Sequence, residues 1–203
     1  MTAALDWISN FLYAAILAGV PLLFGTLGEI LTEKAGNINL GVEGMMYMGA
    51  VFGFMGAYYL DSAIATLLFA FLGGLGGALV YAFLTVTLKA NQNVAGLTLT
   101  IFGTGLANLL GTNMINGSGS GAAMVSDAMK AFFRPMDMGA LTAIPYLGKL
   151  LFNHSLFTYL GIVLAIAAGW YLNHTAQGLN LRAVGESAAT ADAAGINVTL
   201  YKY

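Results

Sequence analysis

Long apolar runs alternate with short polar segments along the whole chain. Each run is long enough to hold a membrane-spanning helix of about 20 residues. The apolar residues are also continuous, whereas the strands of a membrane barrel alternate apolar and polar residues over about ten positions. The runs that contain no Asp, Glu, Lys or Arg are Trp7–Gly28, Gly44–Leu60, Ser62–Leu88, Ala90–Ser126 and Leu150–Leu181.

This pattern predicts an all-α fold, a polytopic transmembrane helical bundle with about five spans in this chain. An odd number of spans would place the two termini on opposite sides of the membrane. The predicted spans cover residues 8–28, 40–60, 63–88, 94–113 and 155–173.

Composition agrees with a membrane location. The 203 residues are 59% hydrophobic and 8% charged, with a mean hydropathy of +0.80, whereas about a quarter of the residues in a soluble domain are charged. The net charge of −2 argues against a nucleic-acid partner. The absence of cysteine excludes disulfides and thiolate metal sites.

The first residues carry Asp6 and no basic residue, so we expect the first run to be retained rather than cleaved as a signal peptide.

The segment between the fourth and fifth predicted spans opens with the flexible sequence "NGSGSGA" and continues "AMVSDAMKAFFRPMDM". Its apolar residues recur at helical spacing, with polar residues opposite, and this predicts a short amphipathic helix. The helix would lie in the membrane interface or pack over the protein's own spans. The apolar positions are Met124, Val125, Ala128, Met129 and Phe132.

Small residues four positions apart recur within the predicted spans. Such spacing lets helix backbones approach closely in a membrane. We expect close packing within this chain rather than a dimerisation face. The series are Gly49/Gly53, Gly73/Gly77 and Gly103/Ala107/Gly111.

No catalytic motif is present in the sequence, so we expect a protein that is not an enzyme. His154 and His174 flank the fifth predicted span and are too far apart for one metal site unless the fold brings them together. Uncharged polar residues near the spans either hydrogen-bond between helices or line a wet path for a neutral polar solute. The candidate substrate-path residues are Asn39, Glu43, Asn93 and Asn108, and Asn91, Gln92 and Asn113 share their character.

The stretch "GEILTEKAGNINLGVEGMMYMGA" resembles the signature of ABC-importer permeases for nucleosides and simple sugars, within the branched-chain amino acid/ribose permease superfamily. In that signature a span ends in Gly-Glu, a Glu-Lys/Arg-x-Gly turn follows, and Asn-Leu-Gly-x-Glu-Gly opens the next helix. The matching residues are Gly28, Glu29, Glu33, Gly36, Asn39, Leu40, Gly41, Glu43 and Gly44.

A second stretch, "GLNLRAVGESAATADAAGINVTLYKY", is similar to the cytoplasmic loop of the same family. The matching residues are Gly178, Arg182, Ala183, Gly185, Glu186, Ala191, Ala194, Gly195 and Ile196. The resemblance covers nearly the whole chain and implies one transmembrane permease domain over residues 1–203, with a coupling loop near residues 176–200. It also implies about three further spans after this loop, so the family's C-terminal spans are expected to be missing here.

The resemblance implies a permease subunit of an ATP-driven importer that moves a nucleoside or simple sugar by alternating access. Implied partners are ATP-binding subunits that carry ATP and magnesium, a second permease in a heterodimer, an extracytoplasmic solute-binding protein and membrane lipid. The chain itself is expected to bind no cofactor. The ATPase-coupling residues implied are Arg182, Ala183, Gly185, Glu186, Ala194 and Gly195. Residues 187–194, nearly all small, would form a helix that seats closely in a partner, and Arg182 and Glu186 would pair along a helix face.

Because the coupling loop would face the ATPase, residues 174–203 are expected in the cytoplasm and the N-terminus outside the bacterial inner membrane. The basic residues are nearly balanced between the two sides and agree only weakly with this orientation. Lys34, Lys89, Arg182 and Lys202 would lie inside, and Lys130, Arg134 and Lys149 outside.

The polar stretch "EKAGNINLGVEG" predicts a non-helical crossing between the first two spans, with Asn37 or Asn39 capping the second helix. It is expected to lie beside the translocation path near the inner gate, because irregular backbone at membrane depth must face protein or a wet cavity. Two other functions fit the composition: an ATP-independent secondary carrier or channel for a small neutral polar solute, and a membrane assembly factor that does not transport.

Overall fold

The structure, a computed structural model, describes residues 2–119, 121–136, 138–142, 144–145 and 147–203. These residues form helices and no strand, which confirms the predicted all-α fold. The long helices are α1 (Thr2–Lys34), α2 (Val42–Leu60), α3 (Ala63–Ala82), α4 (Gln92–Gly117) and α7 (Leu156–His174). The short ones are η1 (Phe83–Thr87), α5 (Asp127–Phe132), η2 (Gly139–Leu141), α6 (Leu147–Phe152), α8 (Ala176–Glu186), α9 (Ala188–Ala193) and α10 (Val198–Lys202).

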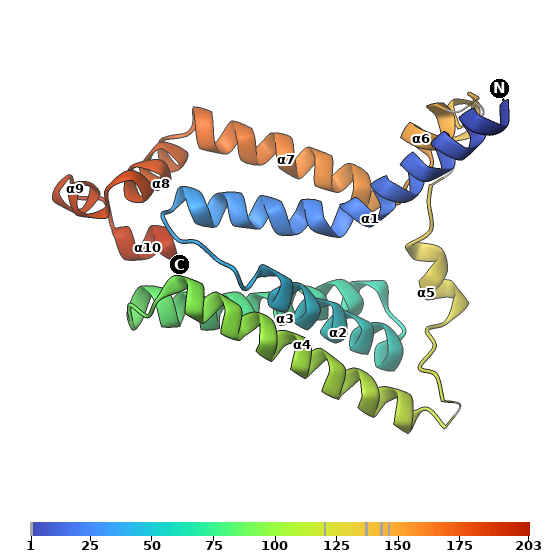
Figure 1. Ribbon diagram of the computed structural model, residues 1–203, viewed down its shortest axis with the longest axis horizontal. Coiled ribbons are helices and arrows are strands. Elements are labelled where there is room, and N and C mark those ends of the chain that lie inside the picture. The colour runs from blue at the N-terminus through green and yellow to red at the C-terminus, as the bar shows by residue number, and fades with distance from the viewer. Residues whose placement is uncertain (1, 120, 137, 143, 146) are drawn as a thin grey trace.

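The long helices form two layers (Figure 1). One layer contains α2, α3 and α4, with α2 packed most extensively on α3 and next on α4. The other contains α1 and α7, and α8 follows α7 at one end of the molecule. The two layers are joined at that end by the connection between α1 and α2, and at the other end by the segment that holds α5 and α6.

Four helices in the described part of the chain are long and apolar enough to cross a membrane. They are Leu5–Lys34, Ala63–Thr87, Gln92–Gly117 and Leu156–His174. The second predicted span, residues 40–60, forms as the 19-residue α2 but does not belong to this set. Glu43 and three tyrosines lower the hydropathy of α2. The predicted count of five therefore holds for long helices and not for strongly apolar spans.

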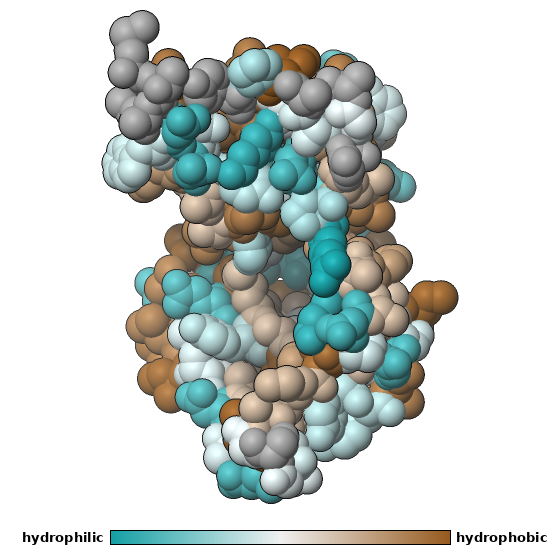
Figure 2. Space-filling view, turned by 90° about the vertical axis from the view of Figure 1, so that its right-hand side faces the viewer, coloured by the Kyte–Doolittle hydropathy of each residue, from teal (hydrophilic) through white to brown (hydrophobic). Residues whose placement is uncertain are grey.

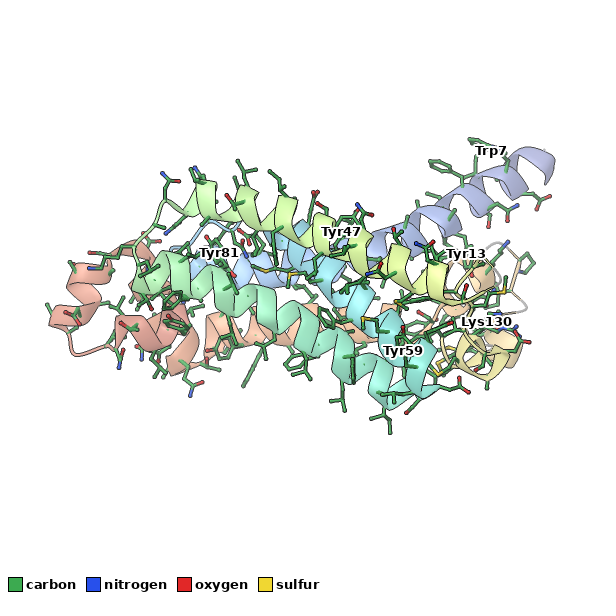
Figure 3. The ribbon with its side chains drawn as sticks, turned by 90° about the horizontal axis from the view of Figure 1, so that it is seen from below. Trp7, Tyr13, Tyr47, Tyr59, Tyr81 and Lys130 are labelled. Carbon is green, nitrogen blue, oxygen red and sulfur yellow. The ribbon has the colours of Figure 1, made fainter. Side chains whose placement is uncertain are left out.

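Helix α1 extends well beyond the predicted span of residues 8–28. Its 33 residues correspond to about 50 Å of helix, against about 30 Å of membrane hydrocarbon. The helix bends along its length (Figure 1) and contains Pro21, whose ring clashes with the preceding turn. Trp7, 68% exposed, lies near the protruding end, beyond Tyr13 (Figure 3).

Glycines set the spacing in the layer of α2, α3 and α4. A Cβ on Gly44 would lie 2.3 Å from the carbonyl oxygen of Leu99, and one on Gly103 would lie 2.3 Å from that of Gly44. Gly49, Gly53, Gly73 and Gly77 likewise meet the neighbouring helix within this chain, as predicted. Gly111 does not, because a Cβ there would meet nothing within 4 Å.

The amphipathic helix expected after α4 is shorter than its pattern suggested. Only residues 127–132 are helical, as α5, so Met124 and Val125 precede the helix. Met129 is buried while Phe132 is 49% exposed. Ser126 caps the helix by accepting from the N–H of Met129 and also donates its hydroxyl to Asp61, at the end of α2. Hydrophilic residues gather on this end of the molecule, which is hollowed between the two layers (Figure 2).

Candidate functional site: the crossing between the first two helices

Residues 35–41 connect α1 to α2 without forming a helix, which confirms the predicted non-helical crossing. Gly36 makes the first turn with φ of +82°, a conformation that side-chain-bearing residues rarely adopt. Asn37 and Asn39 are 3% and 7% exposed, whereas Ile38 and Leu40 are 50% and 47% exposed, so the crossing buries its asparagine side chains and exposes its apolar ones. The N–H groups of residues 35–37 bond back to the last turns of α1, whereas those of residues 38, 39 and 41 bond to side chains.

Side chains from three helices provide the hydrogen bonds that the crossing lacks. From α1, a carboxylate oxygen of Glu29 accepts the N–H of Asn39 at 2.8 Å. From α4, the side-chain oxygen of Gln92 accepts the N–H of Ile38 at 2.8 Å. Also from α4, Thr100 donates to the carbonyl of Leu40 at 2.9 Å.

The third helix, α3, contributes Tyr81, whose hydroxyl donates to the carbonyl of Ile38. Tyr81 is 4% exposed and lies toward the end of the molecule occupied by α8–α10 (Figure 3). The crossing is therefore hydrogen-bonded to both layers of the fold, through α1 on one side and α3 and α4 on the other.

The capping role predicted for Asn37 or Asn39 was wrong. The residue that caps α2 is Gly41. The side-chain oxygen of Asn39 accepts from the N–H of Gly41 at 2.9 Å, which forms an Asx-turn before α2. Asn37 faces elsewhere, and its side-chain oxygen accepts from Lys202 at 3.1 Å and from Gln92 at 3.3 Å.

A cavity of about 660 Å³ lies between α1, α2 and α3, next to the crossing. Its polar lining residues are Glu29, Thr32 and Asn39. The second carboxylate oxygen of Glu29 is buried and accepts no hydrogen bond from the described residues. The rest of the lining is mainly apolar and comprises Pro21, Phe24, Gly25, Gly28, Val42, Met45, Met46, Ala70, Phe71, Gly74, Leu75 and Ala78.

The four predicted substrate-path residues do not converge on this cavity. Asn39 lines it. Glu43 is exposed on α2 and borders a different hollow of about 370 Å³ with Pro21 and Tyr47. Asn93 and Asn108 are exposed on α4, in its first turn and near its middle.

The predicted coupling loop forms three short helices, α8 to α10, after α7. Its Gly185 lies against Gly36 of the crossing: a Cβ on Gly36 would lie 3.1 Å from the Cα of Gly185. A Cβ on Gly185 would lie 2.2 Å from the carbonyl oxygen of Lys34. The two stretches that resemble the permease family thus touch backbone to backbone, through glycines 149 positions apart in the sequence.

The remaining coupling residues occupy two different settings. Arg182 and Ala183 are half-buried, whereas Glu186, Ala194 and Gly195 are exposed. The predicted pairing of Arg182 with Glu186 is absent: Lys130 with Asp127 is the ion pair that the described residues contain. The Nε atom of Arg182 is instead buried without a hydrogen-bond partner. The helix expected at residues 187–194 forms as α9, and Ser187 caps it through the N–H of Thr190.

The fold does not bring the two histidines together. His154 precedes α7, where it is 2% exposed, hydrogen-bonds to the carbonyl of Leu150 at 2.8 Å and stacks on Tyr13. His174 ends α7 and stacks on Trp170. In the described part of the chain, no three His, Asp or Glu side chains gather in a way that could hold a metal ion.

Sequence reasoning assigned no structural role to four residues that hold the crossing. Glu29 was recognised as part of the Gly-Glu motif, and that motif was the available signal. Tyr81, Thr100 and Lys202 carry no local signal, because they lie 43, 60 and 165 positions from their partners.

The apolar helices and the buried polar crossing define the chain as a multi-span helical membrane protein. Residues 11–203 match the family model described as branched-chain amino acid transport system / permease component. The chain therefore belongs to this family of transport permeases. No solved structure matches the chain.

Three relatives of this chain are named as ABC transporter permeases. A Haloferax volcanii protein, provisionally named glucose ABC transporter permease protein TsgC13, is 31% identical over 98% of this chain. The guanosine ABC transporter permease protein NupQ of Bacillus subtilis is 30% identical over 97%. The nucleoside ABC transporter permease protein NupC of Lactococcus lactis is 34% identical over 93%. The chain spans 58%, 62% and 59% of the lengths of these relatives, respectively.

Proposed function

We propose that this chain is a transmembrane permease subunit of an ABC importer that moves a nucleoside or simple sugar into the cell by alternating access. The observation that carries the proposal is the contact of Gly36 with Gly185, because it joins the two family motifs into one structural unit. The names of the relatives assign ABC transport of glucose, guanosine or nucleosides to those proteins, and this supports the proposed solute class.

The proposed assembly contains two permeases, expected to be different chains, and two ATP-binding subunits that bind ATP and magnesium. An extracytoplasmic binding protein delivers the solute. Residues 174–203 face the ATP-binding subunits in the cytoplasm of a bacterial cell, and the N-terminus lies outside. Lys34, Arg182 and Lys202 then lie on the cytoplasmic side and Lys130 on the outer side. Figure 1 shows α8 and α10 at one end of the molecule, and Figure 3 shows Lys130 at the other.

The native mass of the complex purified with this chain in mild detergent tests this assembly. We expect two copies of an ATP-binding subunit and a second permease to co-purify, and uptake by the reconstituted complex to require ATP and the binding protein. Recovery of the chain alone or as a simple homo-oligomer, with uptake that needs no ATP, would favour a secondary carrier and contradict the proposal.

The roles proposed for Asn39 and Glu43 in the solute path are tested by substitution. Asn39→Ala removes a buried side chain that holds the turn before α2 and lines the cavity, and Glu43→Ala removes a carboxylate beside the neighbouring hollow. We expect each variant to assemble normally and to lose uptake. Asn113→Ala, an exposed amide on α4, is the matched control and should transport normally. Normal uptake by both Asn39→Ala and Glu43→Ala would exclude these roles.

A further inference from the structure

The crossing and the C-terminal helices share a small hydrophobic cluster in addition to the glycine contact. Ala35, Leu172 and Leu181 form its buried centre. They come from the start of the crossing, from the end of α7 and from α8. The half-buried residues packed against this centre are Leu31, Tyr171 and Tyr201. The cluster therefore joins α8 and α10 to the point where α1 ends.

Polar contacts reinforce the same junction from α10. Lys202 donates to the side-chain oxygen of the buried Asn37 at 3.1 Å. The side-chain N–H of Asn180, on α8, donates to the hydroxyl of Tyr201 at 3.1 Å, which ties α10 to α8. The hydroxyls of Tyr203 and Thr87 hydrogen-bond, so the same end also reaches η1.

The glycine contact is the stiffest of these connections. Gly185 and Gly36 meet without a side chain between them, and a Cβ on Gly185 would approach the carbonyl of Lys34 to 2.2 Å. Packed atoms resist compression steeply, so a displacement of one backbone segment moves the other. A contact through flexible side chains would instead absorb small displacements by rotamer changes.

From these contacts we infer that α8–α10 and the crossing at residues 35–41 move as one rigid unit. Gly185 and Lys202 are the positioning residues that carry a displacement of α8 directly to the crossing. The inference rests on the proposed function, because it takes the ATP-binding subunit as the source of that displacement. Rigid-body motion of packed elements is a common form of switching in proteins.

The alternative route, along α7 into α1, is looser. A hollow of about 390 Å³ lies between these helices, lined by Phe24, Leu27, Leu31, Leu164 and Tyr171 among others. Where α7 meets α1 at Gly161, a Cβ would touch the side-chain ends of Leu23 and Phe24 rather than backbone. This interface can absorb a shift that the glycine contact would transmit.

The first test measures how many solute molecules the reconstituted transporter moves for each ATP hydrolysed. Gly185→Ala forces the two backbones apart, and Lys202→Met removes the hydrogen bond to Asn37 while keeping side-chain length. We expect the transport-to-hydrolysis ratio to fall at least about fivefold for Gly185→Ala and less for Lys202→Met. The native mass of the complex and ATP hydrolysis should persist in both variants.

Matched controls distinguish this effect from general damage. Gly169→Ala places a Cβ where nothing lies within 4 Å, and Lys89→Met removes an exposed lysine near the same end of the molecule. Both controls should keep the wild-type ratio. An unchanged ratio in Lys202→Met, together with an unchanged ratio in any Gly185→Ala complex that assembles, would overturn the inference.

A second test uses the absence of cysteine from the chain. In the double variant Asn37→Cys/Lys202→Cys the hydrogen bond is lost, and we expect weakened transport. A short reducible bis-thiol cross-linker between the two positions should restore transport, because residues that move together tolerate a covalent link. Failure to restore transport, or a further loss that a reductant reverses, would show that the two segments must separate and would overturn the inference.

These outcomes can be separated from failure of the proposed function. If no ATP-binding subunit co-purifies with the wild-type chain, the proposed function itself fails. If the complex forms and transports with ATP, but the variants and the cross-link leave the ratio unchanged, only the inference about the rigid unit fails.

Discussion

The two layers of the molecule are packed in different ways. In the layer of α2, α3 and α4, glycines bring backbones together so closely that a single added methyl group at Gly44 or Gly103 has no room. In the layer of α1 and α7, the contact at Gly161 meets the ends of flexible side chains, and a hollow separates the two helices farther along. The first layer is a tightly packed block, whereas the second has space for its helices to shift.

This difference bears on the proposed transport by alternating access, which requires a change of conformation. A tightly packed block moves as a body, and a loosely packed pair can slide. The crossing at residues 35–41 lies between the layers and hydrogen-bonds to both, through Glu29 on one side and Gln92, Thr100 and Tyr81 on the other. Relative motion of the two layers would therefore strain or break hydrogen bonds of the crossing.

The largest expected effect is in the tight layer. Gly103→Ala would place a Cβ 2.3 Å from the carbonyl oxygen of Gly44, and overpacking of this kind costs about 1–3 kcal/mol. Gly105→Ala, on the same helix, meets nothing within 4 Å and should leave stability unchanged or raise it by up to about 1 kcal/mol. Thermal unfolding in detergent compares the two variants, and equal melting temperatures would contradict the packing described for this layer.

A smaller effect is expected at the joint between the layers. Tyr81→Phe removes the hydroxyl that donates to Ile38 and should cost about 0.5–1.5 kcal/mol. Tyr47→Phe is the control, because Tyr47 is 52% exposed on α2. Unfolding measurements should separate the variants, and limited proteolysis should cut Tyr81→Phe faster within residues 35–41. Identical behaviour of the two variants would remove Tyr81 from the support of the crossing.

In the loose layer the same Gly-to-Ala change should cost less. A Cβ on Gly161 would lie 2.9 Å from a methyl carbon of Leu23, which can rotate away. We expect Gly161→Ala to lower stability by less than about 1 kcal/mol, with Gly169→Ala as the control. A loss as large as that of Gly103→Ala in the same unfolding assay would show that the two layers are equally tight.

The smallest expected effect is a pH dependence of the local stability of α5, which lies outside the two layers. The hydrogen bond from Lys130, at 3.0 Å, and its positive charge lower the pKa of Asp127 below the usual value. The ionised form is therefore favoured in the folded state, and its contribution is present above the ordinary pKa of Asp and is lost as pH falls through the lowered value. The protection factors for amide exchange at Met129 and Lys130, which compare each rate with the intrinsic rate at the same pH, should fall at low pH. Asp127→Asn should abolish that dependence. A pH dependence that survives the substitution would exclude this carboxylate as its cause.

Much of the fold could be predicted because it depends on local pattern. Continuous apolar runs located α2, α4 and α7 to within a few residues, and likewise α3 together with its continuation η1. The Asn- and Gly-rich stretch located the break between α1 and α2. The extra length of α1 was not predicted, because the expected span ended where charged residues begin, whereas the helix continues through Asp6 at one end and Glu29 to Lys34 at the other. Asn39 was wrongly predicted to cap α2 because an asparagine side chain can accept either from an N–H in the first turn of a helix or from the N–H two residues ahead of it, as it does here.

The candidate site likewise contains residues that could be predicted from the sequence and residues that could not. Its motif residues, among them Asn39, Gly36 and Gly185, could be singled out from the sequence. Their neighbours could not, because the partners lie far along the chain, as Lys202 does from Asn37. Glu43 also belongs to a motif, whereas Asn93 and Asn108 could be chosen only by polarity. The fold places all three on exposed faces, outside the lining of the cavity beside Asn39.

The sequence by itself determined that this is an all-α membrane protein of the permease class with a polar crossing between its first two long helices. Apolar length and periodicity decide helix formation in a membrane locally, so they can be read along the chain. Only the tertiary structure decided which glycines are irreplaceable, what holds the crossing and where the two family motifs meet. Those features depend on distances between segments remote in sequence, which close packing fixes and local pattern does not encode.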